Sequence, residues 1–142
     1  MEQPALPHAL LYITRARVDP AAAARALAGP RDTVLMVTQQ RKPGGTTMGI
    51  FIDDIRAVQR QVRTMGPGPS ADDGRTVVIF ADAALMTPQA QNALLKLLEE
   101  PRPRLHCILA TSTPTRLLAT VRSRCQMRYA APTAVPTTAD KR

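Results

Sequence analysis

Residues 77–127 constrain the fold most, because short apolar runs alternate there with helix signals. Val77–Phe80 is a β-branched and aromatic run of the kind found in strands that are buried on both faces. Thr87-Pro88 predicts a helix start, with a hydroxyl at the N-cap and a proline at the first helical position. His106–Ala110 is the next apolar run. Strands that alternate with helices predict right-handed crossovers and a parallel sheet.

The N-terminal half continues this alternation. We expect strands at His8–Ile13 and Thr33–Gln39, and between them a helix at Pro20–Ala28 that the following Gly-Pro dipeptide ends. Residues 41–49 contain a Pro-Gly-Gly turn signal and are predicted to form a loop. A second helix follows, with Asp53 as its expected N-cap. Its inward face is expected to carry Ile52, Ile55, Val58 and Val62.

The C-terminal part adds a further helix and strand. A second hydroxyl-proline pair, Thr113-Pro114, predicts a helix that begins there, and the last strand is expected at Met127–Tyr129. Residues 66–74 are predicted to form a flexible loop, and residues 132–142 a disordered tail or linker stub. The predicted domain therefore spans residues 1–131. The apolar residues expected on the C-terminal helix are Leu117, Leu118 and Val121.

Composition limits the class of protein. A chain of 142 residues with 44% hydrophobic residues suits one globular domain, and no apolar run approaches the roughly 20 residues of a membrane span. The N-terminus lacks the charged region and long apolar core of a signal peptide. Cys107 and Cys125 are too few for a metal cluster and do not suggest a secreted disulfide scaffold. We therefore expect a cytoplasmic protein without a metal.

Positive charge is concentrated in the C-terminal third. The net charge is +8, and residues 102–142 carry eight of the 19 Lys and Arg residues but only one of the 11 Asp and Glu residues. Such an excess is typical of a surface that meets nucleic acid or another anion. Aromatic residues make up 3%, which disfavours a base-stacking platform. The candidate anion or DNA patch is Arg102, Arg104, Arg116 and Arg128.

The segment Thr14–Asp19 occupies the position where an α/β nucleotide-binding domain has its phosphate loop. Such a loop needs glycines, whose backbone N–H groups converge on the phosphates, followed by Lys and Ser or Thr. The first glycine of this chain is Gly29 and the first lysine is Lys42. The segment therefore cannot form that cradle, and we interpret Arg15 and Arg17 as parts of a solvated loop.

Three motifs in order carry a resemblance to a known family. AQNALLKLLEEP, ILATSTPTRLL and VRSRCQ resemble the AAA+ domain of bacterial clamp-loader subunits. The resemblance implies a RecA-like AAA+ fold, α/β, with about five parallel strands and helices on both faces. Residues 52–56 (IDDIR) resemble a further element of this family. Family members commonly carry a four-cysteine zinc module between the first helix and that element. That interval contains no cysteine here, so we expect no zinc and no cofactor.

Aligned on the same motifs, the two Walker B carboxylates of an AAA+ ATPase fall on Ala81 and Asp82. Those carboxylates hold magnesium and polarise the attacking water. One carboxylate is therefore absent, at Ala81, and the other is shortened by a methylene, at Asp82. Together with the absent phosphate loop, this implies that the chain does not hydrolyse ATP and belongs to the non-hydrolysing branch of the family. We interpret Asp82 as a structural residue that binds loop backbone. Thr111 and Ser112 occupy the sensor-1-like position, and without nucleotide we expect them to cap the following loop.

Ser123-Arg124-Cys125 resembles the clamp-loader SRC motif. In that motif the arginine extends towards ATP bound by the neighbouring subunit, as an arginine finger supplied in trans. A planar and permanently charged guanidinium suits this role, because it can bridge phosphate oxygens and stabilise developing charge. The alternative interpretation of Arg124 is an ordinary surface arginine. Cys107 and Cys125 are expected to be small buried residues, and Lys96 a solvated helix residue.

The resemblance implies partners as well as a site. A clamp-loader subunit would assemble with an ATPase subunit of the gamma/tau type and with the delta subunit, would meet the sliding clamp, and would form part of a DNA polymerase III holoenzyme-type complex. The lid and collar domains of the family have no counterpart in residues 1–142. Two other interpretations stay open. One is a degenerate domain that still binds nucleotide, and the other is a basic module that binds nucleic acid without catalysis.

Overall fold

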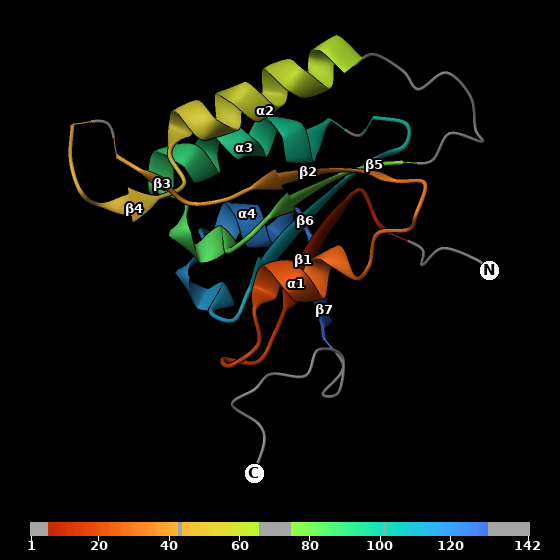
Figure 1. The fold of residues 1–142 in the computed structure, drawn as a ribbon, viewed down its shortest axis with the longest axis horizontal. Helices are drawn as coiled ribbons and strands as arrows, with labels where there is room; N and C mark the ends of the chain where they lie inside the picture. Colours follow the sequence, from red (N-terminus) through yellow and green to blue (C-terminus); the bar gives the residue numbers. More distant parts are fainter. Residues whose placement is uncertain (1–5, 43, 66–74, 101, 131–142) are drawn as a thin grey trace.

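A five-stranded parallel sheet runs through the centre of the domain (Figure 1). The computed structural model describes residues 6–42, 44–65, 75–100 and 102–130. The strand order is β2-β5-β6-β1-β7, and every neighbouring pair in it is parallel. This arrangement confirms the predicted α/β class and its parallel sheet. The strands are β1 (Ala9–Ile13), β2 (Thr33–Val37), β5 (Thr76–Phe80), β6 (Leu105–Thr111) and β7 (Gln126–Tyr129).

Helices cover both faces of the sheet, because successive side chains of a strand point to opposite faces. Leu11 enters a core that it shares with the apolar faces of α2, α3 and α4. Its neighbour Leu10 enters a separate core that contains Ala23 and Ala24 of α1. Figure 1 shows α1 and α3 on opposite sides of the strands. The helices are α1 (Pro20–Arg25), α2 (Ile52–Met65), α3 (Pro88–Glu99) and α4 (Ala119–Ser123).

The predicted centre of the fold is confirmed. Each residue of Val77–Phe80 is completely buried, as expected of a strand with helices on both faces. At the start of α3, the Thr87 hydroxyl oxygen accepts a hydrogen bond from the Ala90 N–H at 3.1 Å, and Pro88 is the first helical residue. Leu94 is also fully buried, so the predicted apolar face of α3 does point into the core.

The predicted N-cap of α2 is wrong, because the helix begins at Ile52, one residue before Asp53. Asp53 is exposed in the first helical turn, where its carboxylate lies 3.8 Å from the Arg56 guanidinium. Asp54 instead accepts a hydrogen bond from the Phe51 N–H at 2.8 Å. A carboxylate three residues into the helix thus reaches back to the residue before it, which is half of a capping box.

The helix predicted to begin at Thr113-Pro114 is divided in two. Pro114–Arg116 forms a 3₁₀ turn, and α4 begins only at Ala119 because Leu117 is extended. The Thr113 hydroxyl makes no N-cap bond. It lies 3.3 Å from the Thr111 hydroxyl instead, so the Thr-Pro signal that works at Thr87 does not start a helix here.

Part of the loop predicted at residues 41–49 is a small hairpin, β3 (Gln40–Arg41) and β4 (Met48–Gly49). The Lys42 N–H donates to the Thr47 carbonyl at 2.7 Å, and Gly44 takes a positive φ of 77° in the turn. The predicted α1 and β2 also end earlier than expected, at Arg25 and Val37.

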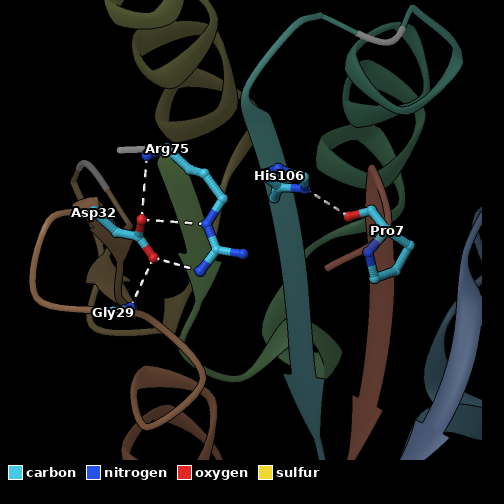
Figure 2. A network of polar contacts seen from close by, with 5 residues as sticks. All are labelled: Pro7, Gly29, Asp32, Arg75 and His106. Atoms are coloured by element: carbon cyan, nitrogen blue, oxygen red, sulfur yellow. Dashed lines mark hydrogen bonds and ion pairs between the residues drawn. The ribbon is translucent and has the colours of Figure 1, made fainter. Parts of the chain in front are cut away.

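An ion pair joins the amino ends of β2 and β5 (Figure 2). Asp32, whose side chain has no exposed surface, accepts from Arg75 Nη2 at 2.6 Å and from the Gly29 N–H at 2.7 Å. Burial alone would raise the pKa of Asp32, but the hydrogen bonds from Arg75 and Gly29 outweigh it and lower the pKa to about 2. On the adjoining part of the sheet, His106 Nδ1 donates to the Pro7 carbonyl at 2.9 Å.

Two predictions lie outside the described residues: the loop at residues 66–74 and the tail at residues 132–142. The predicted division at residue 131 therefore stays a prediction. Among the helices that the structure describes, none is both long enough and apolar enough to cross a membrane.

Candidate functional site

The carboxyl ends of β1, β5 and β6 meet at one edge of the sheet, where a parallel α/β domain binds ligands. Thr14 and Thr111 lie side by side there, since the Thr14 N–H donates to the Thr111 carbonyl at 3.0 Å. Asp82 follows β5, and its Oδ1 accepts from the Ala84 N–H at 3.2 Å. Asp82 thus caps a 3₁₀ turn at Ala83–Leu85, which is the loop-backbone role expected for it.

The segment between β1 and α1 differs from a phosphate cradle in its geometry as well as in its composition. Arg15 and Arg17 are exposed, in agreement with the prediction of a solvated loop. Asp19 caps α1 by accepting from the Ala21 N–H at 3.1 Å, so a carboxylate occupies the start of this helix. The Thr14 hydroxyl is buried and has no hydrogen-bond partner within the described ranges.

Thr111 closes the end of β6. Its side chain is completely buried, and its hydroxyl oxygen accepts from the Thr113 N–H at 3.1 Å. The prediction that the sensor-1-like position caps the following loop is confirmed for Thr111. Ser112 is partly buried beside it.

The SRC residues lie at the end of α4, with Arg124 as the C-cap. Arg124 Nε and Nη2 donate to the same oxygen of Glu99, Oε2, at 2.9 and 2.8 Å. Both side chains are 44% exposed, so the pair lies at the surface and can be reached by another protein. The Ser123 hydroxyl donates to the Thr120 carbonyl at 2.9 Å, within the last turn of α4.

A buried amide fixes the other end of α4. Gln91 is 3% exposed, its Nε2 donates to the Met86 carbonyl at 3.1 Å, and its Oε1 accepts from the Leu118 N–H at 2.7 Å. Leu118 is the N-cap of α4 and has no side-chain oxygen with which to accept a bond. Helix α3 therefore holds α4 at both ends, through Gln91 at the start and Glu99 at the finish.

The roles of Gln91 and Glu99 were not predicted from the sequence. The signal for Gln91 was its position, since a polar residue beside the apolar stripe of α3 has to find a partner when it is buried. The signal for Glu99 was weaker, because a glutamate at the end of a surface helix is ordinary. Their partners lie 27 and 25 residues away along the chain.

The two cysteines are packed as small apolar residues; Cys107 is buried as predicted, whereas Cys125 is only partly buried. Cys107 is completely buried on β6, and Cys125 packs against the core that contains α3 and α4. Burial raises the pKa of the Cys107 thiol to about 12 and that of Cys125 to about 11. Both thiols therefore stay protonated near neutral pH and are poor nucleophiles.

The four arginines of the proposed anion patch do not lie together. Arg102 and Arg104 precede β6, whereas Arg116 belongs to the 3₁₀ turn after it. The seven residues of β6 separate these ends of the sheet by roughly 20 Å. Arg128 lies on the edge strand β7. Within the part of the chain that the structure describes, these four arginines therefore do not form a single stripe for a nucleic-acid backbone.

A shallow cavity of about 170 Å³ lies between α2 and α3. Lys96 is exposed at its rim, as expected of a solvated helix residue. Both basic and acidic side chains line this cavity, so its lining does not favour a ligand of one charge. The lining residues are Gln59, Val62, Arg63, Lys96, Leu97, Glu100 and Arg102.

Comparison with known proteins identifies a consistent set of relatives. The family described as "DNA polymerase III, delta subunit" matches residues 31–133. DNA polymerase III subunit delta' of Escherichia coli (strain K12) is 58% identical over 89 residues, which are 63% of this chain and 25% of that protein. The Bacillus subtilis subunit delta' is 39% identical over 72 residues, 51% of this chain and 21% of that protein. The chain thus spans about a quarter of the length of these curated relatives or less.

A solved structure supports the same assignment at the level of the fold. The crystal structure of a DNA polymerase III gamma subunit-related protein from Thermotoga maritima matches 91% of this chain and 42% of that chain. The TM-score is 0.64 and the sequence identity 28%. The fold of this chain is therefore similar to that of a DNA polymerase III gamma subunit-related protein.

Proposed function

The chain belongs to the DNA polymerase III delta-subunit family, and from this premise we propose that it is a non-hydrolysing clamp-loader subunit that completes a neighbour's ATP site with Arg124. The delta' relatives place the chain in the bacterial clamp-loader family, whose process is DNA replication. On this proposal, the chain lacks the groups that hydrolyse ATP in its own nucleotide site and supplies Arg124 to the nucleotide site of another subunit.

The lack of hydrolysis is supported at two separate positions. The loop before α1 has no glycine, and Asp19 places a carboxylate where an incoming phosphate would need donors. At the Walker B position, Ala81 has no carboxylate, and Asp82 already accepts from the Ala84 N–H. Neither magnesium nor an attacking water would find its usual protein partners there.

The observation that carries the finger is the exposure of Arg124 at the end of α4, a helix that Val121 anchors in the core. Val121 of α4 is completely buried, whereas the Arg124 side chain is 44% exposed. A guanidinium in that position can contact phosphate oxygens of a nucleotide held by an adjacent subunit and stabilise charge that develops during transfer. Such a finger is worth on the order of 10³–10⁵ in rate.

The partners follow from this arrangement. The finger needs an ATP-binding neighbour, for which an ATPase subunit of the gamma/tau type is the candidate. The delta subunit and the sliding clamp would complete the assembly. In such an assembly the chain itself turns over no ATP, and its contribution appears only in the rate of its neighbour.

The test is the ATPase rate of the cognate ATPase subunit with and without this chain. We expect the wild-type chain to raise the rate, and the Arg124→Ala variant to bind equally well without raising it. Arg25→Ala is the matched control, because Arg25 is an exposed arginine on α1, on the opposite face of the sheet. Affinity is measured separately by calorimetry, so that loss of assembly is not mistaken for loss of the finger.

Two results would contradict the proposal. One is a chain that hydrolyses ATP alone at a rate that Asp82→Ala removes. The other is an Arg124→Ala variant that stimulates the partner as well as the wild type does.

A further inference from the structure

Glu99 and Arg124 form the one ion pair, among those of the described residues, that involves the SRC motif. We propose that Glu99 is a positioning residue for Arg124. The Glu99 carboxylate holds one edge of the Arg124 guanidinium and leaves the other edge directed to a neighbouring anion. This inference rests on the proposed function, since it concerns how the trans finger is oriented.

The hydrogen-bond pattern separates the two edges of the guanidinium. Nε and Nη2 of Arg124 both donate to Glu99 Oε2. An arginine has five N–H donors in a planar fork, so the Nη1 group and the second hydrogen of Nη2 remain for another acceptor. These outer donors form a second edge that can pair with a phosphate in a bidentate contact. A carboxylate on the inner edge therefore orients the group without occupying its phosphate-binding edge.

The backbone on both sides of the pair is fixed. Glu99 is the last residue of α3 and Arg124 is the C-cap of α4. Gln91 ties the start of α4 to α3 through the Leu118 N–H, and buried Val121 packs between these ends. Contacts thus join α3 and α4 at both ends of α4, and the Glu99–Arg124 pair lies at one of these two junctions.

The exposure of the pair distinguishes positioning from stabilisation. Ion pairs that are this exposed contribute little to folding, because solvent screens them and two long side chains lose freedom. An ordered side chain is an advantage for binding, however. A guanidinium that Glu99 already orients loses less conformational entropy when it binds a ligand. Replacing Glu99 should therefore alter the reaction in the neighbouring site more than the fold of this chain.

The experiment measures kcat and KM of the partner ATPase subunit in complex with the chain. We expect Glu99→Ala to lower the stimulated kcat roughly tenfold with little change in KM, because a misplaced group costs transition-state contacts. Glu99→Gln should recover much of the rate, since its amide oxygen can still accept from Arg124. Glu100→Ala is the control: it removes the same charge one residue away, from an exposed residue.

A double variant tests whether Glu99 acts through Arg124. In the Arg124→Ala background, Glu99→Ala should have no further effect on kcat. If Arg124→Ala abolishes stimulation while Glu99→Ala behaves like Glu100→Ala, the positioning role is wrong and the finger stands. A Glu99→Ala variant that stimulates more than the wild type would show that the carboxylate restrains Arg124, and it would overturn the inference equally. If Arg124→Ala has no effect, the proposed function itself fails.

Discussion

The side-chain oxygen of Gln91 accepts a hydrogen bond from the Leu118 N–H at 2.7 Å, in a position where Gln91 is almost completely buried. The bond joins the first turns of α3 to the start of α4, and it satisfies a backbone donor that no cap of α4 itself satisfies. The short helix that carries the SRC motif is therefore held from outside its own sequence.

Removing this amide should destabilise the domain. We expect Gln91→Met, which keeps the volume but loses both hydrogen bonds, to lower the free energy of unfolding by about 1–3 kcal/mol, because the Leu118 N–H stays buried without a partner. Urea unfolding measures the difference. Gln89→Met makes the same change at an exposed position of α3 and should be close to neutral. Equal effects of the two substitutions would rule out the role given to Gln91.

The Asp32–Arg75 pair should make stability depend on pH in the acid range. The pKa of Asp32 is lowered from 3.8 to about 2 in the folded protein. A carboxyl with a lowered folded pKa stabilises the protein above its unfolded pKa and loses that contribution as the pH falls through the folded value. The contribution to the free energy of unfolding is about 2 kcal/mol at neutral pH, since a pKa shift of one unit corresponds to about 1.4 kcal/mol.

We therefore expect Asp32→Asn to be less stable than the wild type by about this amount at pH 7, and the difference to shrink as the pH falls from 4 towards 2. Urea unfolding at a series of pH values measures it. Asp53→Asn removes one exposed carboxylate from α2 and controls for the change in net charge. A wild-type advantage over Asp32→Asn that stays constant down to pH 2 would disprove the assignment.

The two Thr-Pro pairs offer a comparison within one chain. Thr87 caps α3 through its hydroxyl, so Thr87→Ala should cost about 1 kcal/mol of stability. Thr113 makes no N-cap bond, and we expect Thr113→Ala to cost less than half as much. Thermal unfolding of both variants under the same conditions checks the order. The reverse order would mean that the contact between the Thr111 and Thr113 hydroxyls matters more than the helix cap.

Local signals predicted most of the fold. The apolar runs at residues 77–80 and 106–110 and the cap at Thr87 were sufficient for the parallel sheet and for α3, because each depends on neighbours in sequence. The errors at Asp53 and Thr113 are also local. In both cases a polar side chain nearby makes a bond that the simple pattern did not include: Asp54 accepts from the Phe51 N–H, and the Thr113 hydroxyl lies against that of Thr111.

The candidate site was less predictable. Resemblance named Arg124, and the structure adds that its side chain is exposed and paired. Neither Glu99 nor Gln91 could be assigned, because a side chain's partner across 25 or 27 residues depends on how α3 and α4 pack. The patch of four arginines was predicted from composition. Composition does not show that Arg102 and Arg104 lie at one end of β6 and Arg116 at the other.

The position of β1 in the sheet has a consequence for how the chain folds during synthesis. β1 is the first strand to be made, yet it lies between β6 and β7, the last two. Its residues Ala9–Ile13 are buried in the finished domain, so on a growing chain they remain an unpaired apolar segment until almost all of the domain has been translated. Pairing across so long a separation closes late and slowly. Until then the segment has no strand partner, and an apolar segment in that state is prone to aggregation.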